Sequence, residues 1–200
     1  MIDQKSLVKN LTASAKNIAA LSESSTVIEA ITRSVGIIVE SYVKGGCLYV
    51  AGNGGSAADA QHIVAELISK LDKNRTPIKA FALSVDTSIL TAIGNDYGYE
   101  YSFSRQLEAV LKPEDVFLAI TTSGNSKNII KGLEVSKKKG TKSILLSGRD
   151  GGLCKSNADV SILVPGQSTA EIQEAHIVVY HNLCWLIEGA LVEKGICQYV

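Results

Sequence analysis

The chain has no excess of charge of either sign, because 20 lysines and arginines balance 20 aspartates and glutamates over 200 residues. There is thus no basic field that would hold nucleic acid regardless of its sequence. No apolar run approaches the ~20 residues that a bilayer span requires, and residues 1–17 lack the apolar core of a secretory signal. We therefore expect a cytoplasmic protein with neither nucleic-acid nor membrane partners.

Three familiar site signatures are missing as well. The four cysteines have no C-x-x-C spacing, which favours reduced thiols over a disulfide or zinc framework. No G-x-G-x-x-G turn is followed by the expected acidic residue, and no glycine-rich turn closes on the Lys-Ser/Thr pair of a P-loop. What is present is 46% hydrophobic content, enough for one compact core, and we expect a single domain over residues 1–200.

Residues 3–44 predict two helices, because apolar residues recur at steps of three and four. The serines of "SESS" (22–25) separate these helices and offer an N-cap to the second. Apolar residues cover a wide arc of the second helix, more than one contact face needs. We expect the pair, residues 1–44, to serve in oligomerisation, with the second helix buried from two sides.

From residue 45 the pattern changes to short apolar runs that are rich in β-formers. There are five of them: "CLYVA" (47–51), "IKAFALS" (78–84), "VFLAITT" (116–122), "SILLSG" (143–148) and "VSILVP" (160–165). Helical segments separate most of these runs, including an amphipathic one at 125–140 and a long closing one at 168–195, with Thr169 as its expected N-cap. The alternation predicts an α/β fold over residues 45–200, a three-layer sandwich whose five-stranded parallel sheet is flanked by helices.

Two of the expected strands end in turns rich in glycine, serine and asparagine, "AGNGGS" (51–56) and "TTSGNS" (121–126). Ligands of open α/β sheets bind beyond the carboxyl ends of the strands. Glycines let the backbone approach a ligand there, and helix N-termini offer free N–H groups to an anion. The second turn adds hydroxyls that suit a phosphate monoester: Thr121, Thr122, Ser123 and Ser126. The alternative is an ordinary capped helix after each strand.

The segment after the first turn carries His62 and Glu66, four residues apart and so on one helical face. Such a pair can bind a divalent metal or divide acid and base chemistry, unless it belongs to a solvated face. In the closing helix, His176 and His181 lie about 60° to one side of Gln173 and about 80° to the other. Only one of these histidines is expected to join Gln173 at a site, and the spacing does not choose between them.

Polar loop residues elsewhere admit two interpretations. Asp86 and Thr87 follow a strand and either cap the next helix or face the ligand. The segment "GNDYGYE" (94–100) predicts a turn, in which Asp96 either forms an Asx turn or contacts substrate. Arg75 and Arg105 are expected to form ion pairs at the surface or in an interface.

Five segments in order resemble the sugar isomerase (SIS) domain family, and most closely the phosphoheptose isomerases. They are "GNGGSAADAQH..AEL", "AIGNDYG.E..FSRQ.EA", "TSGNS.N", "LSG.DGG" and "IQE.H....H", and they extend from about residue 45 to residue 185. Each is weak alone, but five in the family's order are specific. The resemblance implies the flavodoxin-like SIS fold.

The resemblance also implies an activity. It implies an aldose–ketose isomerase that converts sedoheptulose 7-phosphate to D-glycero-D-manno-heptose 7-phosphate. This reaction would be the first step toward nucleotide-activated heptose for bacterial surface glycans, lipopolysaccharide or capsule. The resemblance implies a homotetramer with active sites between subunits, so that Gln173 and His181 are expected from a neighbouring subunit. The alternatives are a non-catalytic SIS-domain adaptor that binds a replication initiator, and an isomerase for another sugar phosphate.

Family site residues carry over by motif. One zinc ion per site would be held by His62, Glu66, Gln173 and His181, and this choice selects His181 over His176. The residues that carry over as substrate contacts, or lie close to such positions, are Asn53, Gly54, Gly55, Ser56, Asp86, Thr87, Asn95, Asp96, Thr121, Thr122, Ser123, Ser126 and Gln173.

The expected chemistry moves a proton between C1 and C2 of the sugar through an enediol, which needs a base at carbon and an acid at oxygen. We expect Glu66 to be the base and His181 the acid, with zinc polarising the carbonyl. Two positions depart from the family, since Lys70 and Glu171 stand where arginine is common. They shift charge near the expected mouth of the site and leave the exact substrate open.

Overall fold

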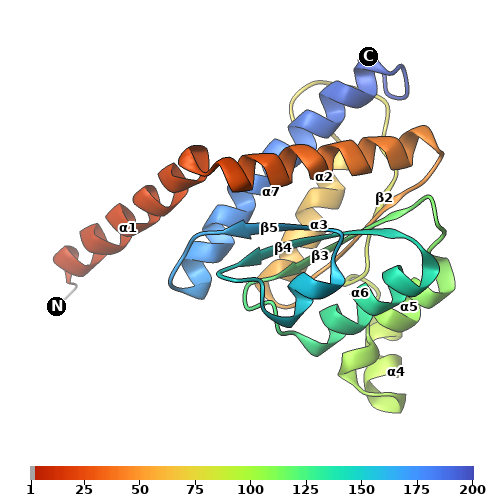
Figure 1. Cartoon of the computed structure of the whole chain (residues 1–200), viewed down its shortest axis with the longest axis horizontal. Coiled ribbons are helices and arrows are strands. Elements are labelled where there is room, and N and C mark those ends of the chain that lie inside the picture. The colour runs from red at the N-terminus through yellow and green to blue at the C-terminus, as the bar shows by residue number, and fades with distance from the viewer. Residues whose placement is uncertain (1–2) are drawn as a thin grey trace.

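The structure, a computed structural model, describes residues 3–200 and begins with two helices, α1 (Gln4–Glu23) and α2 (Ser25–Val43). Ser24 separates them, and its hydroxyl accepts a hydrogen bond from the Val27 N–H, so the predicted N-cap of the second helix is confirmed. α1 projects from the body of the molecule (Figure 1). α2 buries one face against the body, whereas Ile28 and Val43 remain 48% and 56% exposed within one chain.

Five parallel strands form one sheet in the order β2-β1-β3-β4-β5, which is the flavodoxin-like order. Their bounds are β1 (Leu48–Ala51), β2 (Ala80–Ala82), β3 (Val116–Thr121), β4 (Lys142–Gly148) and β5 (Val160–Val164). Each strand coincides with one of the predicted runs, apart from one extra residue at the start of β4. The predicted five-stranded parallel sheet is therefore confirmed.

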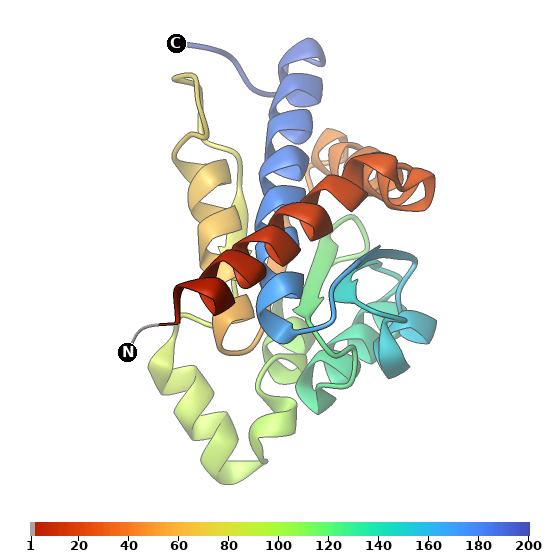
Figure 2. The same cartoon turned by 90° about the vertical axis from the view of Figure 1, so that its left-hand side faces the viewer.

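Helices cover both faces of the sheet (Figures 1 and 2). The first face carries α2, α3 (Gly55–Ile68) and α7 (Thr169–Glu193), and the second carries α5 (Ser104–Val110) and α6 (Lys127–Lys139). Strand β3 feeds both cores, because Leu118 and Ile120 pack on the first side while Phe117 and Ala119 pack on the second. The predicted three-layer α/β sandwich with an N-terminal helical pair is confirmed.

The remaining elements lie at the ends of the sheet. α4 (Thr87–Asp96) follows β2, and two short 3-10 helices span Tyr99–Tyr101 and Gly152–Asn157. α6 ends at Gly140, whose left-handed backbone (φ 71°) confirms the predicted glycine stop. All four cysteines are buried and free, as their spacing predicted.

α7 is the longest helix of the described residues. It begins after Ser168, whose hydroxyl accepts from the Glu171 N–H, so the N-cap predicted at Thr169 is wrong by one residue. By length and composition alone α7 could span a bilayer, with a mean hydropathy of 1.3 over its most apolar window. Half of that window is buried inside the molecule, and Val179, Leu183 and Ile187 pack in the first core. α7 is thus apolar because it is a core helix of the sandwich.

Candidate metal and sugar-phosphate site

The order of the sheet reverses between β1 and β3, and the helices that follow these strands lie on opposite faces. This switch point is where open α/β sheets bind ligands. The turns "AGNGGS" and "TTSGNS" both lie there, as the sequence predicted. The first leads into α3 and the second into α6.

α3 and α7 lie side by side in a defined register. A Cβ at Gly55 would overlap the side-chain amide of Gln173, so the absence of a side chain at the start of α3 makes room for Gln173 on α7. From Gly55 to His62 is a rise of about 10 Å, and from Gln173 to His181 about 12 Å, at 1.5 Å per residue. The two spacings therefore bring His181 level with His62 and Glu66.

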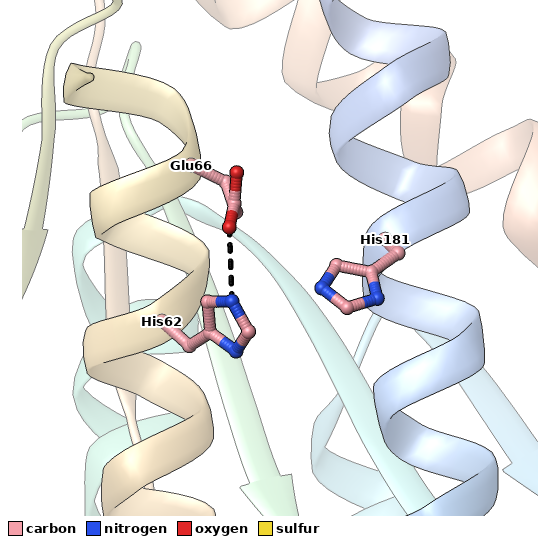
Figure 3. A group of neighbouring side chains, drawn as sticks. All are labelled: His62, Glu66 and His181. Carbon is pink, nitrogen blue, oxygen red and sulfur yellow. Dashed lines mark hydrogen bonds and ion pairs between the residues drawn. The ribbon is translucent and has the colours of Figure 1, made fainter. Parts of the chain in front are cut away.

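His62, Glu66 and His181 form one cluster between α3 and α7 (Figure 3). His62 Nε2 lies 2.9 Å from Glu66 Oε1, and the rings of His62 and His181 meet edge-on with centroids 5.0 Å apart. One potential ligand atom from each of the three residues lies within 4.8 Å of the others. The His62 side chain is 46% exposed and that of Glu66 16%, so the cluster is open to solvent.

The donor set of this cluster fits a metal ion. Two imidazoles and one carboxylate are ligand types of catalytic zinc sites, which keep a further position open. The side-chain amide of Gln173 lies against Gly55 at the start of α3, about 12 Å of helix rise before His181. Within one chain, α7 places His181 beside His62 and Glu66, and Gln173 beside Gly55; the expected contribution of a neighbouring subunit stays a prediction.

The two histidines of α7 have different surroundings. His176 is fully buried, and neither of its ring nitrogens has a hydrogen-bond partner among the described residues. Burial lowers the pKa of His176 to about 4, so the ring is neutral at pH 7. His181 instead reaches the cluster. The structure therefore makes the same choice between the histidines as the family resemblance.

In the second turn, "TTSGNS", the serine that precedes α6 does not cap that helix with its side chain. Ser126 occupies the N-cap position of α6 but makes no side-chain cap; its hydroxyl lies 3.2 Å from Thr121 Oγ1. Thr121 is buried, Thr122 is half-buried and Ser123 is exposed, with the Ser123 hydroxyl accepting from the Asn125 N–H. The capped-helix interpretation thus does not hold for Ser126, and the start of α6 can offer N–H groups to an anion.

A pair of amides joins the two turns across the switch point. Asn53 and Asn128 exchange hydrogen bonds of 2.9 and 2.8 Å, and Tyr99 donates to Asn53 Oδ1 at 3.0 Å. The sequence predicted Asn53 as a substrate contact but gave no role to Asn128 or Tyr99. The final Asn of the motif "TSGNS.N" is Asn128, which was the one available signal for this pair.

The first turn is shaped by its glycines and by one buried serine. Gly54 has a φ of 54°, a backbone conformation that disfavours larger residues, and lies in the open. Ser56 is 3% exposed, and its backbone N–H donates to the Asn53 carbonyl. Gly54 therefore remains accessible to a ligand, whereas Ser56 is covered in the single chain.

The predicted contacts of the α4 region lie at its surface. Asp86 caps α4, since its carboxylate accepts from the Ile89 N–H at 2.9 Å, and Thr87 is exposed in the first turn. Asn95 and Asp96 are joined by a 2.7 Å hydrogen bond. They belong to the last turn of α4, so the turn predicted at 94–100 is wrong for its first three residues. The left-handed position is Gly98, with a φ of 100°.

The two departures from the family have local roles. Glu171 forms a capping box at the start of α7, where its carboxylate accepts from the N–H groups of Gln167 and Ser168. These hydrogen bonds hold the pKa of Glu171 below its usual value. Lys70 donates to Asn74 Oδ1 in the segment after α3. A glutamate at position 171 is thus explained by helix capping.

Two residues beside the cluster were not singled out from the sequence. Tyr180 is a core residue whose hydroxyl lies 2.8 Å from His62 Nδ1. Asp59 is 8% exposed, and its Oδ2 has no partner among the described residues. Burial raises the pKa of Asp59 to about 6, and burial together with Asp59 raises the pKa of Tyr180, which keeps that phenol protonated.

Arg75 is buried, contrary to the expected surface or interface position. Its guanidinium donates to Glu188 Oε2 on α7 at 2.7 Å and to the backbone carbonyls of Glu66 and Leu67 at 2.6 and 2.7 Å. The side chains of Arg75 and Glu188 are 0% and 5% exposed. One residue therefore ties the end of α3 to α7 next to the candidate metal cluster.

The fold and this site define a sugar isomerase domain, and residues 12–148 match the SIS domain family. The chain is 49% identical over 166 residues to the phosphoheptose isomerase of Citrifermentans bemidjiense, covering 83% of this chain and 86% of that protein. It is 53% identical over 157 residues to the phosphoheptose isomerase of Leptospira biflexa, covering 78% and 80%. The chain therefore belongs to the phosphoheptose isomerases, a family of sugar-phosphate isomerases.

Solved structures of this family have the same architecture. The phosphoheptose isomerase of Neisseria gonorrhoeae superimposes with a TM-score of 0.87 at 35% identity, covering 93% of this chain and 98% of that one. The phosphoheptose isomerase of Francisella tularensis superimposes with a TM-score of 0.89 at 31% identity, covering 94% and 100%. The predicted family and its isomerase class are thereby confirmed.

Proposed function

We propose that the protein converts sedoheptulose 7-phosphate to D-glycero-D-manno-heptose 7-phosphate, as an aldose–ketose isomerase that supplies nucleotide-activated heptose for surface glycans. The observation that carries the proposal is the His62–Glu66–His181 cluster, which is open to solvent. An acid, a base and a metal-binding donor set in one place are what an enediol isomerisation requires.

The substrate's phosphate is assigned to the "TTSGNS" turn. Ser126 leaves the start of α6 uncapped, and the hydroxyls of Thr121, Thr122 and Ser123 surround that helix start. An anion there is stabilised by free N–H groups without a basic residue. A seven-carbon sugar with its phosphate at the start of α6 would extend its reacting carbons toward the cluster between α3 and α7.

Glu66 is the proposed base and His181 the proposed acid. Glu66 would take the proton from the carbon next to the carbonyl, and His181 would deliver a proton to the neighbouring oxygen. One zinc ion would be held by His62, Glu66, Gln173 and His181, and when bound it would polarise the sugar carbonyl as a Lewis acid. Asn53, Gly54 and Gly55 would lie along the sugar, with Asn53 oriented by its amide pair with Asn128.

A homotetramer in the cytoplasm is part of the proposal. Leu7, Val8 and Leu11 on the projecting α1 are 54–62% exposed, and α2 leaves Ile28 and Val43 uncovered. Apolar side chains on projecting helices are suited to burial between subunits. Residues 1–44 would thus assemble the oligomer, and the α/β part would carry the site. The exposed α4 contacts, Asp86, Thr87, Asn95 and Asp96, would complete the pocket on assembly.

The direct experiment is to incubate the protein with sedoheptulose 7-phosphate and follow aldose formation by coupled assay or NMR. Turnover with zinc and loss of turnover after chelation are expected, with recovery on adding zinc back. The absence of turnover in the zinc-loaded protein would overturn the proposed reaction. Fructose 6-phosphate and ribulose 5-phosphate serve as matched ketose substrates, and faster conversion of either would move the proposal to another sugar phosphate.

A further inference from the structure

Tyr180 places one polar atom at the edge of the candidate metal cluster. Its side chain is 1% exposed and packs in the first core, yet its hydroxyl lies 2.8 Å from His62 Nδ1. The rings of His62, Tyr180 and His181 meet edge-on in pairs, with centroids 4.9–5.4 Å apart. Tyr180 thus contacts the cluster in two ways. Its ring packs edge-on against both histidines, and its hydroxyl is within hydrogen-bond distance of His62.

The two nitrogens of His62 have different partners. Nε2 faces Glu66 Oε1, and Nδ1 faces the Tyr180 hydroxyl. A neutral imidazole binds a cation through the nitrogen that carries no proton. Because Nε2 is the nitrogen on the side of Glu66, a metal shared by these residues would bind Nε2. The proton of His62 must then be at Nδ1, where Tyr180 Oη is its only hydrogen-bond partner among the described residues.

We propose that Tyr180 is a positioning residue for the metal site, whose hydroxyl accepts the Nδ1 proton of His62 and holds the ring with Nε2 directed at the ion. The inference rests on the metal site proposed above. A metal-ligating histidine that donates its second N–H to a fixed acceptor is oriented and made a better ligand. A hydroxyl can also donate to Nδ1 when His62 carries its proton on Nε2, so one group serves the metal-free and the metal-bound forms.

The rest of α7 shows what the hydroxyl adds. His176 is buried on the same helix without any hydrogen-bond partner among residues 3–200, and it takes no part in the cluster. Tyr42 is a second buried tyrosine, 8% exposed, whose hydroxyl donates to the Lys79 carbonyl at 2.8 Å. It is therefore a matched control, because Tyr42→Phe removes a buried hydroxyl of similar geometry from the same core but away from the cluster.

The experiment measures zinc affinity by competition with a chromophoric chelator, using the full chain with Tyr180→Phe and Tyr42→Phe. Loss of an outer-shell partner typically weakens metal binding 10–100-fold, and we expect a loss in this range for Tyr180→Phe. Tyr42→Phe is expected to leave zinc affinity unchanged. Equal zinc affinity in Tyr180→Phe and the wild type would overturn the role of Tyr180 while leaving the metal site in place.

A second measurement needs no variant and so does not depend on how Tyr180→Phe folds. The sequence has only three histidines, so 15N-histidine labelling of the zinc-loaded wild type gives a spectrum of three side chains. We expect His62 to carry its proton on Nδ1 and to bind zinc through Nε2. Zinc bound through Nδ1 would overturn the inference. A wild type that binds no zinc would overturn the proposed metal site and this inference with it. That result differs from an unchanged zinc affinity in Tyr180→Phe, which would overturn only the role of Tyr180.

Discussion

The two turns at the switch point have similar sequences but lead to different chemistry. After β1, glycines make room for Gln173 and α3 carries His62 and Glu66 toward α7. After β3, hydroxyls gather at the uncapped start of α6, with no imidazole or carboxylate in the turn. In the proposed function, the same strand–turn–helix unit therefore serves a metal along its helix in one case and an anion at its helix start in the other. The predictions below perturb the α3–α7 cluster and the start of α6 separately.

The largest effect is expected on the metal side, from Glu66→Gln. Removing a general base typically costs 10²–10⁴-fold in rate, and the amide cannot accept the carbon-bound proton. The measurement is kcat for sedoheptulose 7-phosphate in the zinc-loaded protein, with the oligomeric state checked by size-exclusion chromatography. Glu134→Gln, at an exposed position of α6, is the control and should keep the wild-type rate. An active Glu66→Gln enzyme would mean that another residue is the base.

The second prediction concerns the buried tie between α3 and α7. Arg75→Met leaves Glu188 buried without its partner, which typically costs 3–5 kcal/mol of unfolding free energy. Guanidinium unfolding should show this loss. Lys142→Met is the matched control, because it breaks an ion pair with Asp159 that is 61% and 33% exposed, and exposed pairs contribute about 0–1 kcal/mol. Similar losses in both variants would show that burial does not set the strength of the Arg75 tie.

Much of this architecture follows from local sequence. The five apolar runs became the five strands, and the serine and glycine signals set the ends of α2 and α6. Family motifs, rather than spacing, selected His181. What local sequence did not reveal was set by packing between distant segments. Three such contacts join residues that are far apart in the sequence. Gly55 packs against Gln173, the buried Arg75 pairs with Glu188, and the Tyr180 hydroxyl meets His62. The N-cap of α7 was misplaced by one residue because Ser168 and Thr169 are adjacent and both residue types are good N-caps.

The third prediction uses pH to test the burial of His176. Burial lowers the pKa of His176 to about 4 in the folded state, below the ordinary value of 6.5. The unfolded chain therefore takes up a proton that the folded chain resists, and stability falls as the pH drops from 6.5 toward 4. The loss from this group at pH 5 is about 2 kcal/mol, at 1.36 kcal/mol per pKa unit. Because the raised pKa of Asp59 stabilises the fold over the same pH range, this loss is measured as the difference in pH dependence between the wild type and a variant without the His176 imidazole, from unfolding at pH 7 and pH 5.

His176→Leu is the variant for this test, since a leucine at 176 has no proton to bind. Relative to its own stability at pH 6.5, this variant should lose less stability than the wild type as the pH drops to 4, whatever its absolute stability. His181→Asn should instead lose turnover. An unchanged slope in His176→Leu would show that other groups dominate the acid sensitivity of the first core.

The smallest effect is expected on the anion side, from Ser126→Ala. A hydrogen bond to a charged group is worth about 1.5–3 kcal/mol, and neighbouring hydroxyls and the N–H groups of α6 remain to hold the phosphate. We therefore expect KM for sedoheptulose 7-phosphate to rise roughly tenfold, at the lower end of that range, with kcat nearly unchanged. Zinc affinity should stay at the wild-type value, because the hydroxyl of Ser126 meets Thr121 and not the α3–α7 cluster. A Ser126→Ala enzyme that loses zinc rather than phosphate affinity would mean that the two turns do not divide the site as proposed.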